Sequence, residues 1–501
     1  MDANEFQLGN RALYVMGAYL AMMLVIGWIG RRSRKEETLR DFYLAGSTFG
    51  FVVLFLTLFA TQYSGNTLLG FAGRAYRQGA TYIVSVMFMT AVITVFTIYA
   101  PRLVRLARTF GYITPPDYVY HRFGSPALHI GAVILLVWGL ANYVLENLVA
   151  MGHAMVTISD GNISFMWGVI ILVVVMLTYE TLGGMRSVAW TDVVQGTILL
   201  AGLGCILFML LTIDGGLSAA HDVIAQEVPE KLTAPDDAGL RTWFSSLILL
   251  GFGVSVYPHA MQRLFAAKSL RTLRVSLAGM AFMPLTTTLL AFLMGYLALS
   301  RFPELTQFES DRVTILVLID MTKGSPFTFW LVVLIFSAIV AAIMSTADSA
   351  LLSISSMFTK DIYKVYINKD ASPHHLLMVG KIFGWCLIAV LVAMAWISQK
   401  TESSIWLLIL LKLEFLVQIS PMFVLGIHWR KLPASAVLAG LIVGTGITLT
   451  IWGGVMFEVW NNRSPWNVSA GVWGLAANYA ICIIGGLLFP ATSAKLQGLR
   501  T

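Results

Sequence analysis

The sequence predicts an all-α integral membrane protein with about thirteen transmembrane helices. Of its 501 residues, 57% are hydrophobic and only 12% are charged, whereas about a quarter of the residues in a typical soluble domain are charged. Apolar runs long enough to cross a bilayer recur along the whole chain. Two of these runs are interrupted by glycine, proline and polar residues, and such a break is tolerated in a membrane only where the backbone is buried in protein or lines a cavity.

The apolar runs follow one another closely, with short connections between most of them. They lie near residues 12–30, 47–73, 80–100, 127–157, 163–180, 188–213, 243–262, 275–299, 326–357, 376–397, 403–427, 433–455 and 468–490. No soluble domain is expected between or beyond them. We therefore expect a single transmembrane domain over residues 1–501, with an extra helix in 1–40, a core in 41–430 and further helices in 431–501.

The basic residues predict how the chain is oriented. If the N-terminus lies outside, most of the 33 lysine and arginine residues fall on the inner side, and cytoplasmic loops are the ones enriched in these residues. We expect a multi-pass protein of the cell membrane with its N-terminus outside and its C-terminus in the cytoplasm. Because topology accounts for the net charge of +7, no nucleic acid partner is expected, and no obligate protein partner is evident.

Two spans that lie five spans apart are unlike the others. Residues 60–67 of the second span read ATQYSGNT, and the seventh span carries Gly251, Gly253 and the run Tyr257-Pro258-His259. Since an odd number of spans inverts the second unit relative to the first, the pair predicts an inverted five-plus-five helix repeat. Broken helices at corresponding places of such a repeat mark the midplane site of a secondary transporter. The alternative is that both are ordinary kinked packing helices, because glycine is common in membrane spans.

These breaks supply candidate contacts to a solute, because the ends of half-helices suit a carboxylate group. The candidates are Gln62, Ser64, Gly65, Asn66, Tyr257 and His259. For His259 two roles stay open, since its ring either contacts the solute or bonds a neighbouring carbonyl group.

The span near 326–357 carries an oxygen-rich face. Ser345, Asp348 and Ser349 are spaced i, i+3 and i+4, so they share one side of a helix, and Thr346 adjoins Ser345. A charged aspartate within a bilayer costs about 3 kcal/mol on insertion scales, so it normally faces a partner or a cavity. Oxygen ligands without sulfur suit a hard cation such as Na⁺. In the alternative, the hydroxyls bond their own helix and Asp348 pairs with a buried base.

Further polar side chains lie in the fourth and eleventh spans. Asn142 and Glu146 share one helix face, as do Glu414 and Gln418, whereas Lys412 points elsewhere. Two interpretations stay open. The side chains contact the solute, or they form an interhelical pair such as Glu146 with Lys412.

Six sequence runs form a wider pattern. They are residues 41–46, 60–65, 183–196, 262–269, 341–349 and 358–363, of which 183–196, GGMRSVAWTDVVQG, is the most specific. Together they resemble the sodium:solute symporter family, which includes sodium/proline, pantothenate, sialic acid and glucose carriers, and the resemblance extends over nearly the whole chain. It implies an inverted five-plus-five helix core, with one helix before it and further helices after it.

The resemblance also implies a sodium site. Its ligands would be the carbonyl oxygens of Ala60, Tyr63 and Ala342 and the hydroxyl oxygens of Ser345 and Thr346. These are five neutral oxygens, with the dipoles of broken helices directed at the ion.

Four other positions are assigned by the same resemblance. Asp192 resembles a carboxylate near the sodium path, and its alternative role is a helix-start cap. Asp348 and Ser349 lie where some relatives have a second sodium site, so the sequence leaves open whether one or two sodium ions are bound in each cycle. Gln62 stands where proline carriers have an acidic residue.

These observations predict a sodium-coupled secondary active symporter that imports a small organic solute, an amino acid or an organic anion, by alternating access. The expected partners are the solute, Na⁺ and the lipid bilayer. The alternative is a solute-sensing membrane protein with the same fold, which would carry an appended signalling domain. No HExxH, GxSxG or P-loop pattern is evident in the loops, so an enzyme is not expected.

Overall fold

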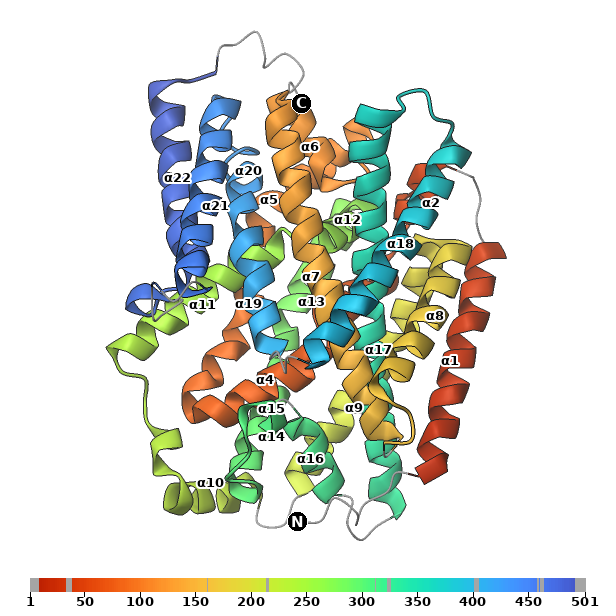
Figure 1. Cartoon of the computed structure of the whole chain (residues 1–501), viewed down its shortest axis with the longest axis vertical. Coiled ribbons are helices and arrows are strands. Elements are labelled where there is room, and N and C mark those ends of the chain that lie inside the picture. Colours follow the sequence, from red (N-terminus) through yellow and green to blue (C-terminus); the bar gives the residue numbers. More distant parts are fainter. Residues whose placement is uncertain are drawn as a thin grey trace.

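The computed structural model describes residues 9–32, 38–159, 161–212, 216–310, 312–321, 326–400, 405–456, 459 and 464–491. Most of these residues are helical, and the one β-type pairing among them is an isolated bridge between Phe49 and Ala267. Most of the long helices run along the longest axis of the molecule (Figure 1). The prediction of an all-helical membrane protein is therefore confirmed.

The longer helices form the body of the protein. They are α1 (Gly9–Arg32), α5 (Phe88–Phe110), α7 (Pro126–Ile158), α8 (Phe165–Gly183), α9 (Met185–Thr212), α11 (Asp237–Ser255), α17 (Pro326–Met357), α18 (Pro373–Lys400), α21 (Ala434–Met456) and α22 (Ala470–Leu488). A π-helical turn, Phe358–Ile367, extends α17.

Shorter helices complete or connect these elements. They are α2 (Leu39–Leu44), α3 (Phe51–Gln62), α4 (Gly65–Gln78), α6 (Pro115–Phe123), α10 (Gly216–Glu227), α12 (Pro258–Ala266), α13 (Leu270–Phe282), α14 (Thr288–Arg301), α15 (Gln307–Ser310), α16 (Val313–Met321), α19 (Ile405–Leu416) and α20 (Ser420–Val424). The 3₁₀ turns are Ala45–Ser47, Gly79–Met87, Pro229–Leu232, Met283–Leu285, Val417–Ile419 and Pro465–Asn467.

Fewer single helices are long enough to span a bilayer than the number of spans predicted. Among the described residues, 11 helical stretches are long and apolar enough to span a bilayer, compared with the thirteen spans expected. The second and eleventh predicted spans are each divided, and their apolar pieces α3 and α19 have 12 residues each. A helix needs about 20 residues to cross the hydrocarbon core, so neither piece is long enough by itself.

Local sequence signals explain where several helices begin and end. α7 begins with Pro126 in its first turn, after Ser125, whose hydroxyl accepts a hydrogen bond from the Leu128 amide at 3.3 Å. α5 ends at Gly111, whose φ of 72° is the left-handed conformation that glycine adopts without strain. These signals hold the helix ends in place around the interior described below.

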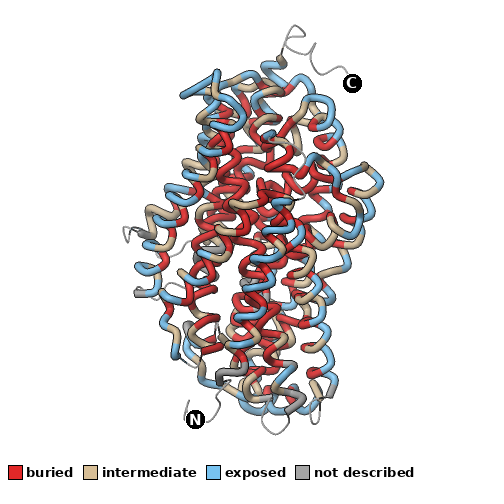
Figure 2. The backbone as a smooth tube through the Cα atoms, turned by 90° about the vertical axis from the view of Figure 1, so that its right-hand side faces the viewer, coloured by how far each residue is buried: buried red, intermediate tan, exposed pale blue. Residues whose placement is uncertain are grey.

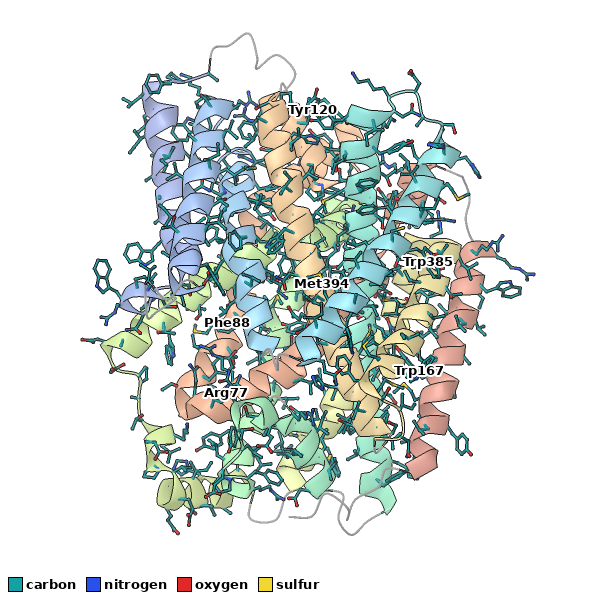
Figure 3. All side chains as sticks on the ribbon, viewed as in Figure 1. Arg77, Phe88, Tyr120, Trp167, Trp385 and Met394 are labelled. Carbon is teal, nitrogen blue, oxygen red and sulfur yellow. The ribbon has the colours of Figure 1, made fainter. Side chains whose placement is uncertain are left out.

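Helix α17 lies at the centre of the bundle. In its most apolar window, within 332–367, 94% of the residues are buried, whereas the corresponding value for α1 is 33%. α17 packs against α7, α9, α3 and α12, and Figure 2 shows a continuous buried interior inside an exposed periphery. The lipid-facing surface carries large apolar groups such as Trp167 and Trp385, labelled in Figure 3, which are 64% and 43% exposed.

Helix α1 is held against α8 and α9 at very close range. A Cβ atom built on Gly27 would lie 2.3 Å from Cβ of Tyr179, and one built on Gly30 would lie 2.3 Å from Oγ of Ser187. Small residues at membrane helix contacts allow this kind of backbone approach. The contact brings Tyr179 to the inner side of α8, where it reaches the polar centre of the protein.

Candidate functional site

Both spans that the sequence predicts to be broken are broken in the structure. α3 ends at Gln62 and α4 begins at Gly65, with Tyr63 at φ −102° and ψ 88° between them. α11 ends at Ser255, and α12 begins at Pro258, which lacks the amide hydrogen that a continuous helix needs. The breaks leave backbone carbonyl groups in the interior that are available to a ligand.

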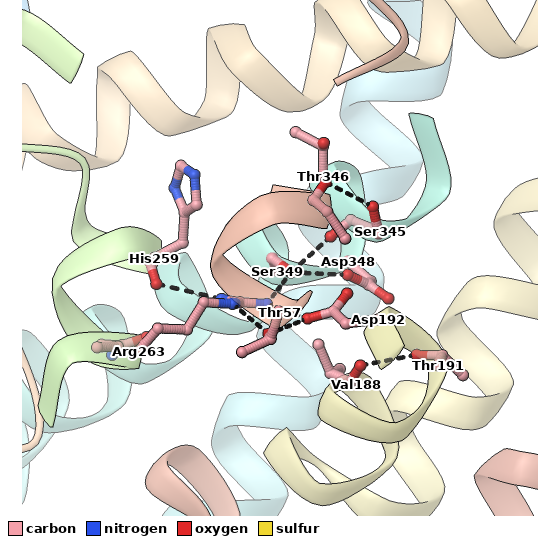
Figure 4. A network of polar contacts seen from close by, with 12 residues as sticks. Thr57, Val188, Thr191, Asp192, His259, Arg263, Ser345, Thr346, Asp348 and Ser349 are labelled. Atoms are coloured by element: carbon pink, nitrogen blue, oxygen red, sulfur yellow. Dashed lines mark hydrogen bonds and ion pairs between the residues drawn. The ribbon is translucent and has the colours of Figure 1, made fainter. Parts of the chain in front are cut away.

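The first break meets the centre of α17. The Ser345 hydroxyl lies 2.9 Å from the carbonyl oxygen of Ala60 and 3.1 Å from that of Ala342, and the Thr346 hydroxyl donates to Ala342 at 2.9 Å. All four residues are buried, as is Tyr63 one turn after Ala60. The residue types fit a sodium ion, since these contacts are made by neutral oxygen atoms on two helices. Figure 4 shows Ser345 and Thr346 at the edge of a larger polar network.

Arg263 occupies the centre of that network (Figure 4). Its guanidinium donates to Asp192 at 2.8 Å, to Thr57 at 2.7 Å and to the hydroxyl of Ser349. The Asp192 carboxylate also accepts from Thr57. The side chains of Arg263 and Asp192 are both 0% exposed, so this is a buried ion pair that joins α3, α9, α12 and α17.

The cap role considered for Asp192 is wrong, because α9 begins at Met185 and Asp192 lies two turns inside it. Asp348 does not pair with a base among the described residues. Its carboxylate accepts from the Tyr179 hydroxyl at 2.5 Å, and its other oxygen lies 2.9 Å from the Ser349 hydroxyl. Arg263, Thr57 and Tyr179 are site residues that were not predicted from the sequence, because their partners lie far away along the chain.

A cavity of about 60 Å³ is lined by residues of both broken segments. Its polar wall includes Gln62, Ser64, Tyr257, Glu146 and Lys412. The ammonium group of Lys412 lies 2.5 Å from a carboxylate oxygen of Glu146, which confirms the interhelical pair. The apolar wall of the cavity is formed by Phe71, Phe88, Met89, Val92, Leu250, Val254 and Leu413.

Lys412 is also placed over aromatic rings. Its ammonium nitrogen lies 3.5 Å from the centroid of the Tyr143 ring and 5.8 Å from that of Tyr257, within the range of a cation–π interaction. The Gln62 amide is buried, and neither its nitrogen nor its oxygen has a hydrogen-bond partner among the described residues. The cavity therefore combines one cation, one anion and a free amide group with an apolar wall.

The family model for the sodium:solute symporter family matches residues 42–444 of the chain. The chain belongs to the sodium:solute symporter family. Its members are transporters and not enzymes, so this symporter couples solute transport to Na⁺ in a multi-pass membrane domain. The family resemblance drawn from the six sequence runs is confirmed.

Individual relatives cover most of the symporter. It is 27% identical to a sodium/proline symporter of Salmonella typhimurium over 87% of this chain and 86% of that protein. It is also 27% identical to a sodium/glucose cotransporter of Vibrio parahaemolyticus, over 90% of this chain and 86% of that protein. A solved Na⁺-coupled sialic acid symporter, in a substrate-bound outward-open state, matches with a TM-score of 0.78 and 21% identity, over 97% of this chain and 100% of that one. It therefore shares the fold.

Several predicted solute contacts do not line the cavity of the symporter. Glu414 accepts a hydrogen bond from the Trp452 indole of α21, and the Gln418 amide donates to the carbonyl group of Gly471, at the start of α22, at 2.8 Å. Neither side chain is among the lining residues of the cavity, so their contact with the solute stays a prediction. Asn142 is buried in α7 but is not among the lining residues.

The remaining predicted contacts lie near the breaks of the symporter. Gly65 and Asn66 begin α4, and the side chain of Asn66 lies outside the described residues. The ring of His259 stands 5.1 Å from that of Tyr257 and 5.4 Å from that of Tyr143, measured between centroids. Neither ring nitrogen has a hydrogen-bond partner among the described residues, so the carbonyl bond considered for this ring is not formed.

Proposed function

We propose that this symporter imports an amino acid together with Na⁺. The observation that carries the proposal is the Lys412–Glu146 ion pair in the cavity wall. In the empty carrier each charge neutralises the other, which avoids the cost of an unpaired buried charge. A zwitterionic solute offers its carboxylate to Lys412 and its ammonium group to Glu146. An organic anion would satisfy Lys412 and leave Glu146 without a counter-charge.

The proposed sodium site consists of Ala60, Tyr63, Ala342, Ser345 and Thr346. Its support is the contact between the Ser345 hydroxyl and the Ala60 carbonyl at 2.9 Å, which brings α17 to the break after α3. Bound Na⁺ would replace these hydrogen bonds with ion–oxygen contacts on both helices. Because no charged ligand holds the ion, it is released when the site opens inward. Moving one positive charge inward across 100 mV supplies about 2.3 kcal/mol.

We propose one sodium ion per transport cycle. The guanidinium of Arg263 contacts Ser349, which together with Asp348 was considered for a second ion, and it also contacts Asp192, the carboxylate predicted near the sodium path. A fixed positive charge at that position opposes a second cation by direct repulsion. In this proposal Asp192, Asp348 and Ser349 hold Arg263 and Tyr179 in place rather than coordinate Na⁺.

The proposal includes the architecture expected from the sequence. It consists of one domain with thirteen spans in the cell membrane, an inverted five-plus-five core in 41–430, an outer N-terminus and a cytoplasmic C-terminus. Its support is that two broken helices, α3–α4 and α11–α12, lie far apart in the chain, which is the arrangement that an inverted repeat with one broken helix in each unit would produce. Alternating access would expose the cavity between them to one side of the membrane at a time.

Uptake into liposomes tests the proposed substrate and ion. Purified protein is reconstituted, an inward Na⁺ gradient is imposed, and labelled amino acids are compared with the matching carboxylic acids that lack the amino group. We expect uptake of an apolar amino acid only with Na⁺, and at least about tenfold slower uptake of its deamino analogue. Faster uptake of the carboxylic acid than of the amino acid would contradict the proposal that the solute is a zwitterion. Equal uptake when choline replaces Na⁺ in the buffer would contradict sodium coupling.

The sodium site is tested by removing one hydroxyl at a time. Ser345→Ala and Thr346→Ala are each expected to raise the Na⁺ concentration for half-maximal uptake about tenfold, since each removes one oxygen ligand and about 1.4 kcal/mol corresponds to a factor of ten. Ser337→Ala is the matched control, because this hydroxyl lies on the same helix and, within the part of the chain that the structure describes, donates only to the Val333 carbonyl. A Na⁺ dependence in the first two variants equal to that of Ser337→Ala would argue against the site.

A further inference from the structure

A second cavity, of about 750 Å³, is lined by the last part of α5, by α6 and by residues 426–430 after α20. It lies at the end of the molecule that also holds α20 (Figure 1). It is strongly basic. Its described lining residues are Arg102, Arg105, Leu106, Arg108, Thr109, Tyr118, Arg122, Gly426, Ile427, His428 and Arg430, with no aspartate or glutamate among them. Neither the sodium site nor the solute cavity uses this group of arginines.

Two of the arginines donate hydrogen bonds to backbone carbonyl groups. Arg122 donates to the carbonyl groups of Gly426 at 2.9 Å and of Trp429 and Arg430 at 2.8 Å. Arg108 donates to the carbonyl group of Ala267 at 2.6 Å. These bonds fix the shape of the cavity wall, because they join α5 and α6 to segments more than 100 residues away in sequence.

Arg102 belongs to the same framework. Its guanidinium lies 2.6 Å from Nδ1 of His428, whose other ring nitrogen is 2.8 Å from the carbonyl oxygen of Ile98. By contrast, no hydrogen bond or ion pair joins the guanidinium of Arg105 or Arg430 to any described residue. The cavity therefore presents two free guanidinium groups on a wall that other arginines keep rigid and positive.

The surroundings of the cavity indicate the kind of anion it would bind. Ile98, whose carbonyl oxygen lies 2.8 Å from a ring nitrogen of His428, and Phe110, which follows Thr109 in the sequence, are 45% and 40% exposed. Exposed apolar and aromatic side chains next to basic ones are typical of the membrane–water interface. Planar guanidinium groups match phosphate oxygens, and basic pockets between membrane helices bind the head groups of anionic lipids.

We propose that this cavity binds the phosphate group of an anionic phospholipid, with Arg105 and Arg430 as its direct ligands. Arg122 and Arg102 position the wall, and the acyl chains lie along the exposed apolar side of α5. The site is separate from the sodium and solute sites, so the proposal does not depend on the identity of the transported solute.

Thermal unfolding of the purified full-length protein tests the proposal. Phosphatidylglycerol in mixed micelles is expected to raise the unfolding temperature of the wild type by about 3 °C or more relative to phosphatidylcholine. The double variant Arg105→Gln/Arg430→Gln is expected to lose most of this shift. The matched control is Arg271→Gln/Arg274→Gln, which removes the same net charge from two exposed positions on α13 that do not line the cavity.

The outcomes separate the possible sources of binding. Equal loss in both double variants would overturn the proposal in favour of non-specific attraction to a basic surface. No shift in the wild type would overturn it by showing that the protein does not bind the anionic lipid. A shift of the same size with glycerol phosphate in place of the lipid would overturn the lipid as the source and leave a soluble phosphate ester. Native mass spectrometry provides a second measurement, since phosphatidylglycerol is expected to stay bound to the wild type and the control and to be lost from Arg105→Gln/Arg430→Gln.

Discussion

Replacing Arg263 with methionine is expected to destabilise the symporter by about 3–5 kcal/mol, the usual result of removing one partner of a buried ion pair. The substitution leaves the carboxylate of Asp192 buried without its counter-charge, and it removes the donors to Thr57 and Ser349. Because these contacts join four helices around the proposed sodium site, Na⁺-dependent uptake should be lost as well. Thermal unfolding in detergent and uptake into liposomes measure the two effects.

Two control variants show whether the effect of Arg263→Met comes from leaving the buried charge of Asp192 unpaired. Arg271→Met removes an arginine from an exposed position on α13 and is expected to leave the unfolding temperature within about 1 °C. Arg263→Met combined with Asp192→Leu removes both charges, and is expected to recover much of the stability without recovering uptake. An Arg263→Met variant as stable as the wild type would show that the ion pair contributes little to the fold.

Replacing Lys412 with methionine is expected to reduce kcat/KM for solute uptake at least about 100-fold, which corresponds to about 2.7 kcal/mol. The variant removes the proposed partner of the solute carboxylate and leaves Glu146 without its counter-charge in the cavity wall. Glu146→Gln is expected to have an effect of similar size on kcat/KM. In both variants the Na⁺ dependence of the residual uptake should change less than the solute dependence.

Glu414 provides the control for these two variants. It is a buried glutamate two residues after Lys412, but it accepts a hydrogen bond from Trp452 and does not line the cavity. Glu414→Gln should therefore leave the KM for solute within about threefold of the wild type. A KM for Glu414→Gln raised as far as that of Glu146→Gln would support Glu414 as a solute contact and count against the Lys412–Glu146 pair.

The parts of the site that local sequence determines were predictable. Glycine and proline within apolar runs located both helix breaks, and the spacing of Ser345, Asp348 and Ser349 placed three oxygen-bearing side chains on one face of α17. These signals depend only on neighbouring residues and on the geometry of a helix. They hold even though the number of helices long enough to span a membrane differs from the thirteen expected.

The parts that depend on partners distant in sequence were not predictable. The sequence places the end of the seventh span at residue 262, which leaves Arg263 in a loop, whereas α12 continues to Ala266. Its partners Thr57 and Asp192 are 206 and 71 residues away, and no periodicity reveals such pairs. Similarly, their spacing places Glu414 and Gln418 on one face of a helix, but spacing alone does not determine whether that face contacts the cavity or the helices α21 and α22.

The burial of α17 has a consequence for how the surrounding membrane influences this protein. Bilayer thickness acts through side chains that touch lipid, and these lie on peripheral helices such as α1, α18 and α22, whose most apolar windows are each only 33% buried. In α17 the corresponding window is 94% buried. A change in bilayer thickness therefore affects the positions of its hydroxyl groups only through movements of the surrounding helices. A thicker bilayer should therefore alter the rate at which the carrier changes conformation while leaving the intrinsic affinity for the ion nearly constant.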